Sequence, residues 1–287
     1  MRTIELAAHA KINLTLDVVG RRPDGFHELR SVFARVSLAD EVRVRRARAW
    51  RVSIRPPLAD RPDLAERAAR DLARRVGRAD AATIAIRKRI PVASGLGGGS
   101  SDAAHTLRAL AALWRVGPSR YEANVAATAS AIGSDVPFFL DGPLALVRGR
   151  GEQVQALDGG PWWGALAFLG GRISTAAAFA RLEPASWSDG TRTARLVDAL
   201  RSRAVGAAEL RELCGNDLDA VAVSLCPAIA RLRAELSPTP LFLTGSGPAL
   251  FAIAHDRGGA LAIRRRIRRA GARAIVIQIA IAPESSS

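Results

Sequence analysis

Apolar and polar positions in the first third of the chain alternate or run together in ways that predict β-strands. Residues 3–19 alternate at the start and then become continuously apolar, and a Pro-Asp-Gly turn follows at 23–25. Shorter apolar runs predict four more strands, at 32–38, 41–44, 52–54 and 83–90. Before the last of these, apolar residues recur at helical intervals over 63–76. The first part of the chain is therefore expected to form a sheet with one helix.

A glycine-rich segment, 91–102, follows these strands, and helical spacing resumes over 101–114. Several strands, one helix, another strand and then a loop leading into a helix do not make a repeating βαβ series. This order is typical of an α+β fold.

The pattern changes near residues 156–162, where Asp158-Gly159-Gly160-Pro161 precedes an apolar strand at 163–169. Beyond this strand, helical spacing predicts three helices, at 176–182, 193–200 and 228–236. A hairpin with a Gly-Ser-Gly-Pro turn is expected over 241–252, followed by a helix and a strand, 274–281. We therefore expect two domains, residues 1–157 and 158–287, with a disordered tail at 283–287.

The composition of the 287 residues, 48% hydrophobic and 24% charged, is that of an ordinary globular protein with a sizeable core. No run approaches the ~18 apolar residues of a membrane helix, and the start of the chain lacks the features of a secretory signal. We expect a cytoplasmic protein that binds no membrane. The two cysteines, Cys214 and Cys226, have no histidine close in sequence, so neither a disulfide framework nor a zinc site is indicated.

The formal charge of +15 raises the question of a nucleic acid partner. The basic residues are dispersed, no aromatic residues are interleaved with them, and the densest run, 264–269, has the helical pattern of a solvated face. We therefore expect no nucleic acid partner. Of the 42 basic residues, only Lys11 and Lys88 are lysines. Because lysine places one compact charge where arginine presents a planar fork, these two are candidates for specific roles.

Four glycines within 95–99 make this segment the strongest candidate for a phosphate site. Glycine permits positive φ, so that successive N–H groups can turn toward one anion, and the start of a helix adds unpaired N–H groups and partial positive charge. The segment differs from a P-loop because no lysine follows the last glycine. Ser100 and Ser101 offer hydroxyls to phosphate oxygens or Mg²⁺, unless they only cap the helix.

Three other segments accompany this loop. Lys11 and Asn13 alternate with apolar residues on a strand that is expected to be buried, where the ammonium needs a partner. Asp135 lies in Gly-Ser-Asp-Val-Pro-Phe, and a second glycine turn occurs at 244–247. In this order, and over nearly the whole chain, the motifs resemble those of the family that comprises galactokinase, homoserine kinase, mevalonate kinase and phosphomevalonate kinase, the GHMP kinases.

This resemblance implies a two-domain fold, with an N-terminal domain like the second domain of ribosomal protein S5, a ferredoxin-like C-terminal domain, and an active site between them. The segment 22–29, Arg-Pro-Asp-Gly-Phe-His-Glu-Leu, resembles the subgroup that uses ATP, with Mg²⁺, to phosphorylate the 2-hydroxyl of 4-diphosphocytidyl-2-C-methyl-D-erythritol in the non-mevalonate pathway to isoprenoids. The resemblance therefore implies this small-molecule substrate, and we expect a monomer or a weak homodimer.

The resemblance also implies roles for individual residues. Asp135 would accept the proton of the attacking hydroxyl while Lys11 holds that hydroxyl or a γ-phosphate oxygen, and a structural ion pair is the alternative. The nucleotide-binding residues would be Lys88, Pro91, Val92, Ala93, Ser94, Gly95, Leu96, Gly97, Gly98, Gly99, Ser100 and Ser101. The substrate-binding residues would be Asn13, Phe26, His27, Thr175 and Phe179.

Each substrate-binding residue also has a plainer interpretation: Asn13 pairs locally on its strand, His27 is exposed in its turn, and Phe179 belongs to the core. The sequence departs from the family at two positions. Phe26 stands where tyrosine is more common, which removes one polar contact, and Asp63 stands where an asparagine contacts adenine, although aspartate offers acceptors only.

Three other functions compete with this assignment. The closest is a kinase of the same family that acts on a different alcohol. An RNA-binding module would follow from the positive charge and the S5-like fold. A dinucleotide-dependent oxidoreductase is disfavoured, because the glycine loop comes after several strands and lacks a downstream βαβ unit.

Overall fold

The computed structural model describes residues 2–57, 64–78 and 80–282. Asp63, at the position that contacts adenine in the family, and the tail predicted to be disordered at 283–287 lie outside these residues. No helix in the described part of the chain is long and apolar enough to cross a bilayer.

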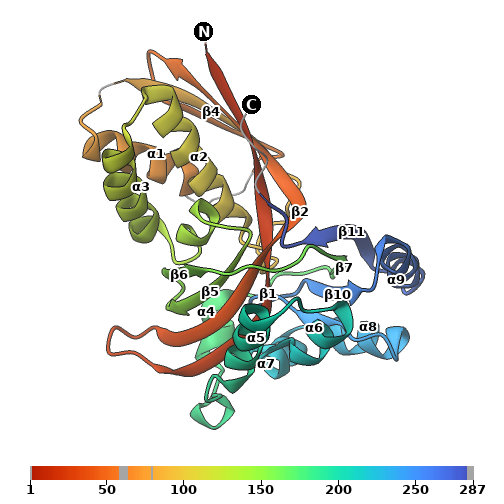
Figure 1. Cartoon of the computed structure of the whole chain (residues 1–287). Helices are drawn as coiled ribbons and strands as arrows, with labels where there is room; N and C mark the ends of the chain where they lie inside the picture. Colours follow the sequence, from red (N-terminus) through yellow and green to blue (C-terminus); the bar gives the residue numbers. More distant parts are fainter. Residues whose placement is uncertain (1, 58–63, 79, 283–287) are drawn as a thin grey trace.

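Two long antiparallel strands, β1 (Thr3–Arg21) and β2 (His27–Ala47), run along the molecule and are joined by a turn (Figure 1). The two strands predicted at 32–38 and 41–44 are one continuous strand. The reason is that Asp40, the polar residue between them, stays paired with β1 and is buried, so it does not end the strand.

The N-terminal sheet extends from β2 through four shorter strands, β3 (Arg51–Arg55), β4 (Ala81–Arg87), β5 (Leu144–Gly149) and β6 (Gln153–Ala156). The helical elements of this half are α1 (Leu64–Arg75), α2 (Gly98–Trp114), α3 (Pro118–Ile132) and the 3₁₀ helix η1 (Pro137–Leu140). The sequence pattern predicts α1 and α2 but not α3. Helix α3 buries mainly Val125, Thr128 and Ala129, and this narrow stripe gives little helical periodicity.

The C-terminal half is built on four antiparallel strands in the order β11-β7-β10-β9. They are β7 (Trp162–Phe168), β9 (Phe242–Leu243), β10 (Leu250–Ala254) and β11 (Arg273–Ile279). Helices lie between β7 and β9 along the chain, and helix α9 (Arg257–Arg269) between β10 and β11. This sequence of elements and this strand order are those of a ferredoxin-like fold, which confirms the expected architecture.

The remaining elements of this half are α4 (Thr175–Ala180), η2 (Pro184–Ser186), α5 (Thr191–Ser202), α6 (Ala207–Leu213), β8 (Gly215–Asn216), α7 (Asp219–Leu225) and α8 (Ala228–Leu236). The three helices predicted from spacing correspond to α4, α5 and α8, and the predicted hairpin to β9 and β10. The basic run 264–269 lies on α9, where Arg265, Arg268 and Arg269 are exposed, as expected of a solvated face, whereas Arg264 and Arg266 are half-buried.

The two halves are joined by strand pairing as well as by the chain. Ile279 of β11 pairs with Val36 of β2, and β8 runs parallel to β1 at Thr15 and Leu16. The long β1–β2 ribbon therefore contacts both halves, and Figure 1 shows it passing between them. The connection from β6 to β7 contains the boundary predicted between residues 157 and 158, which stays a prediction.

Candidate active site

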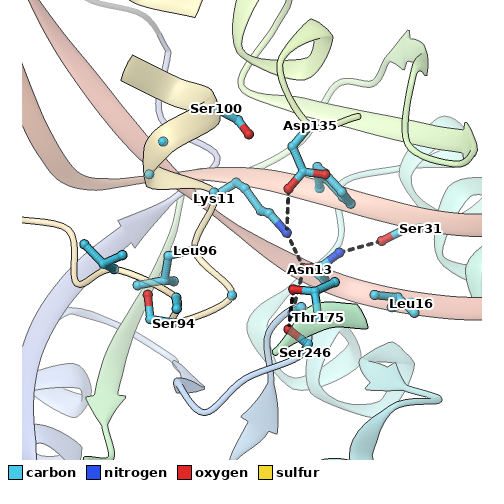
Figure 2. A pocket seen from close by; sticks show the side chains of 18 of the residues that line it. Lys11, Asn13, Leu16, Ser31, Ser94, Leu96, Ser100, Asp135, Thr175 and Ser246 are labelled. Atoms are coloured by element: carbon cyan, nitrogen blue, oxygen red, sulfur yellow. Dashed lines mark hydrogen bonds and ion pairs between the residues drawn. The ribbon is translucent and has the colours of Figure 1, made fainter. Parts of the chain in front are cut away.

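A cavity of about 740 Å³ lies between the two halves. Its walls come from β1, the glycine loop, the turn that carries Asp135, helix α4 and the turn between β9 and β10 (Figure 2). Most residues predicted from the sequence line this cavity: Lys11, Asn13, Lys88, every residue from Pro91 to Ser100, Asp135, Thr175 and Phe179.

The glycine loop is held in place by backbone contacts with both halves. The Lys11 N–H donates to the Leu96 carbonyl at 3.0 Å, which ties the loop to β1. Gly95 has φ of +81°, and a Cβ built on it would lie 2.1 Å from the carbonyl oxygen of Thr244 in the β9–β10 turn. The two glycine turns thus pack backbone against backbone, an approach that only glycine permits.

Helix α2 begins at Gly98, within the glycine run, and not at Ser101 as its spacing predicts. Its N-cap, Gly97, has φ of 68° and has no side chain that could cap the first N–H groups. These groups lie at the cavity wall, where the helix dipole favours an anion. Sequence spacing places the helix start too late because glycine has poor helix propensity. In the structure the first turn of α2 packs closely against the Ile90 side chain. A Cβ built on Gly98 would lie 2.9 Å from Ile90, so this packing favours glycine despite its poor helix propensity.

The two serines after the glycines face different environments. Ser100 lines the cavity. Ser101 is fully buried and its hydroxyl donates to the His9 carbonyl at 2.6 Å, which anchors α2 to β1. The expectation that the Ser101 hydroxyl contacts the nucleotide is therefore wrong, because this hydroxyl points away from the cavity to a backbone partner.

Lys11 and Asp135 meet in the cavity, as Figure 2 shows. The Lys11 ammonium lies 3.5 Å from an Asp135 carboxylate oxygen, and it donates to Asn13 Oδ1 at 2.8 Å. It also lies 4.4 Å from the centre of the Phe33 ring, where a cation–π contact favours the charged form. Asp135 remains about one third exposed, so its carboxylate is accessible from the cavity.

Burial lowers the pKa of Lys11, and the attraction of the Asp135 carboxylate opposes this effect. The strand that carries Lys11 thus places a desolvated ammonium beside a carboxylate that faces the cavity. Such a pair can hold a hydroxyl, accept its proton and stabilise negative charge on a neighbouring oxygen.

Asn13 connects the two halves at the site. Its Oδ1 accepts from the Gly245 N–H at 2.8 Å as well as from Lys11, and its Nδ2 donates to the Ser31 hydroxyl at 3.0 Å. The side chain is buried, so these bonds fix its orientation. The plainer interpretation of Asn13 as a locally paired strand amide is wrong, because its partners include a residue of the β9–β10 turn.

Lys88 lines the cavity but is bound by two carboxylates. Its ammonium donates to Asp40 and, at 2.6 Å, to Asp102, and all three side chains are buried. Burial lowers the pKa of Lys88, but the two carboxylates outweigh it and the net pKa is raised. Because Asp40 and Asp102 already hold the Lys88 ammonium, the structure does not show Lys88 as a free cation for the glycine loop, and its contact with the nucleotide stays a prediction.

The Phe179 ring, which lines the cavity, is the first of a group of aromatic rings. His27 stacks on Phe179 with ring centres 5.1 Å apart, and Trp187 meets His27 edge-on at 6.2 Å. Burial lowers the pKa of His27, aided by the nearby Arg21, which favours a neutral ring able to donate and accept hydrogen bonds.

Phe26 and His27 do not line the cavity itself. Phe26 is 50% exposed, and the Arg150 guanidinium lies 5.3 Å from its ring centre. His27 is adjacent to the cavity through Phe179, whose half-buried ring lines the cavity and also packs against the apolar core of the C-terminal half. The Thr175 hydroxyl lies 3.0 Å from that of Ser246, across the cavity wall.

Three residues at the site carry no sequence signal that singles them out. Arg67 and Arg150 line the cavity, and Trp187 packs on His27. The two arginines are hidden among many others in the chain. Only the distribution of lysines is unusual enough to be noticed in the sequence.

A metal site built by the protein alone is not present in the described residues, because no three His, Cys, Asp or Glu side chains gather there. Cys214 and Cys226 are both free thiols.

Comparison with known proteins relates this chain to one family. The sequence profile of the GHMP kinases N terminal domain matches residues 63–143, and that of the GHMP kinases C terminal domain matches residues 196–273. The chain is 40% identical over 274 residues to a 4-diphosphocytidyl-2-C-methyl-D-erythritol kinase of Gloeobacter violaceus, which covers 92% of this chain and 89% of that protein. It is 41% identical over 283 residues to the protein of the same name from Mycolicibacterium gilvum, covering 94% and 87%.

Solved structures agree with these matches. A crystal structure of 4-(cytidine 5'-diphospho)-2C-methyl-D-erythritol kinase superposes with a TM-score of 0.80 at 32% identity, over 97% of this chain and 100% of that one. Homoserine kinase from Cytophaga hutchinsonii superposes with a TM-score of 0.76 at 16% identity, over 99% and 96%, a likeness of fold alone. Two matched domain profiles, relatives of nearly equal length and a shared two-domain fold show that this chain belongs to the GHMP kinase family.

Proposed function

We propose that this protein transfers the γ-phosphoryl group of ATP to the 2-hydroxyl of 4-diphosphocytidyl-2-C-methyl-D-erythritol, a step of the non-mevalonate route to isoprenoid precursors. The observation that carries the proposal is the Lys11–Asp135 pair, 3.5 Å apart in a cavity that has an uncapped helix start on one side and stacked aromatic rings on the other. Full-length relatives at about 40% identity, named for this activity, support the choice of substrate.

The phosphates of ATP would lie against the glycine loop, where the first turn of α2, which has no side-chain cap, lines the cavity. Asp135 would accept the proton of the attacking hydroxyl. Lys11 would hold this hydroxyl and offset the charge that develops on the transferred phosphoryl group. Asn13 keeps the Lys11 ammonium in place through its 2.8 Å bond, so the geometry exists before substrate arrives.

The cytidyl end of the substrate would bind at the aromatic end of the cavity. The Phe179 ring offers a stacking face, and the neutral His27 ring offers hydrogen bonds to a base edge. In the present structure the two rings stack on each other, so a base that enters between them must separate them. Phe26 would add a second apolar face, and Thr175 a hydroxyl near the reacting end.

Mg²⁺ is expected to accompany the nucleotide. Mg²⁺ in kinases is commonly held by substrate phosphates, water and one or two carboxylates. The carboxylates that line the cavity, Asp102 and Asp135, are each bound to a lysine, and so they do not form a preformed cage for the ion. We therefore assign no residue of the chain as a metal ligand and no step of the reaction to the ion.

The test is a coupled assay of ADP release with ATP and the purified cytidyl substrate. Asp135→Ala and Lys11→Ala are expected to lower kcat by a few orders of magnitude, while the Kd of a non-hydrolysable ATP analogue changes only several-fold. Asp158→Ala, an exposed aspartate outside the cavity, is the matched control and should keep full activity. Full turnover by the Asp135 variant would remove this residue from the mechanism.

Substrate profiling separates the proposal from its rivals. Turnover of homoserine or mevalonate, with none of the cytidyl substrate, would assign a different alcohol to the same fold. Salt-sensitive binding of RNA without ATP turnover would instead indicate an RNA-binding module. For the assembly we propose a monomer or a weak homodimer, which sedimentation at several concentrations would test.

A further inference from the structure

The cations at the phosphate site are already engaged. Lys88 is bound between Asp40 and Asp102, and Lys11 lies beside Asp135. Each lysine is thus matched by at least one carboxylate, so neither leaves a net positive charge for the phosphates of a nucleotide. The N–H groups at the start of α2 supply partial charges only. A triphosphate bound here would gain from one more cation.

Arg67 is placed to supply it. This residue lies on α1, is exposed, and lines the same cavity as the glycine loop. Leu64, one turn earlier on α1, lies against the start of α2: a Cβ on Gly99 would be 3.6 Å from its Cδ1 atom. Residues three apart share a helix face, so the face of α1 that carries Arg67 is the face next to the first turn of α2.

The other arginines of α1 are all paired. Arg70 bonds Glu66 at 2.6 Å and 2.8 Å and lies over the Trp50 ring, and Arg74 and Arg75 both pair with Asp71. Arg67 alone among the four has no ion pair or hydrogen bond from its side chain to the described residues. Its charge is therefore not offset by a neighbouring carboxylate within that part of the chain.

We propose that Arg67 binds the phosphate groups of the nucleotide and serves as the free cation that the glycine loop lacks. This inference rests on the proposed function, in which a nucleoside triphosphate binds in this cavity, and it adds a residue to that binding site. The guanidinium is a planar fork with five donors, which suits two oxygens of a phosphate chain. Arg67 is a positioning residue, since Asp135 and Lys11 remain the groups assigned to the reacting atoms.

The experiment compares Arg67→Gln and Arg67→Lys with Arg74→Gln, the control, which changes a 78% exposed arginine of the same helix. Calorimetry measures the Kd of AMPPNP, of AMP and of adenosine for each folded variant, without the second substrate. Arg67→Gln is expected to weaken AMPPNP binding by about 10- to 100-fold, the range for losing charge-assisted hydrogen bonds, and adenosine binding by less than about twofold. Arg67→Lys should recover part of the loss.

Kinetics adds an independent readout. The KM for ATP should rise in Arg67→Gln, while the KM for the alcohol substrate stays within about twofold of the wild-type value. Equal losses for adenosine and AMPPNP would mean that Arg67 contacts the base, and an Arg67→Gln protein that matches Arg74→Gln would mean that it contacts no ligand. Either result overturns the inference. Because the binding measurements need no phosphoryl acceptor, they remain decisive even if the proposed alcohol is not the substrate.

Discussion

Asp102→Asn tests the charge state of the buried group that holds Lys88. Asp102 is 4% exposed, its Oδ2 accepts from Lys88, and its Oδ1 is buried without a hydrogen-bond partner in the described structure. Burial raises the pKa of Asp102 from an ordinary 3.8 to about 8, the Lys88 ammonium opposes this shift, and the neighbouring Asp40 carboxyl adds to it. The folded protein therefore holds the Asp102 proton to a higher pH than the unfolded chain does.

The sign of the effect on stability follows from proton binding. Between about pH 4 and pH 8 the unfolded chain has released the Asp102 proton, whereas the folded protein retains it. The folded state then binds more protons than the unfolded state, so the contribution of Asp102 to stability falls as pH rises through this window. Each pH unit contributes at most about 1.4 kcal/mol. We expect a total on the order of 3 kcal/mol between pH 5 and pH 8.

The asparagine variant has nearly the same shape and cannot titrate, so it should not show this loss. The free energy of unfolding of the variant should therefore rise relative to that of the wild type, by on the order of 3 kcal/mol between pH 5 and pH 8. Urea unfolding at several pH values measures both, and the difference between variant and wild type removes the titration of all other groups. A difference that does not grow with pH would mean that Asp102 is ionised in the folded protein throughout, and that the reasoning from burial is wrong.

Three further variants test other contacts. Gly95→Ala should lower Tm and abolish the stabilisation by AMPPNP, because its Cβ would lie 2.1 Å from the Thr244 carbonyl oxygen; thermal unfolding with and without the analogue measures both. Asn13→Leu should reduce the free energy of unfolding by about 3 kcal/mol, since it leaves the Lys11 ammonium and the Gly245 N–H without the acceptor that they share, and unchanged urea unfolding would contradict this. Phe179→Ala should raise the KM for the cytidyl substrate about tenfold and leave the KM for ATP unchanged in steady-state kinetics.

The residues of the site that belong to short sequence motifs can be predicted from the sequence. The glycine run, Lys11 and Asp135 each have neighbours that make them recognisable, and the structure brings them to one cavity. The partners of Lys88 are not predictable in this way. Asp40 lies 48 residues earlier and Asp102 lies 14 residues later, and their meeting depends on how β2 packs against the start of α2. Pairings of this kind are set by tertiary structure, which local patterns do not encode.

The helices show the same limit. Helix α9 has a clear apolar spacing and is predicted, whereas α3 buries a narrow stripe and is not. The start of α2 is misplaced because propensity disfavours glycine there, although the packed structure requires it. Such conflicts between local preference and observed structure are expected at functional sites.

The contact between the two glycine turns has a consequence for the order in which the protein becomes able to bind nucleotide. The Thr244 hydroxyl bonds the Gly95 carbonyl across 149 residues of sequence, and the Gly245 N–H bonds Asn13 across 232. During synthesis the glycine loop emerges first, and it lacks these partners until the β9–β10 turn has been made. The nucleotide loop is thus completed by residues made much later, so a polypeptide that stops before this turn carries the glycine motif without the structure that gives it function.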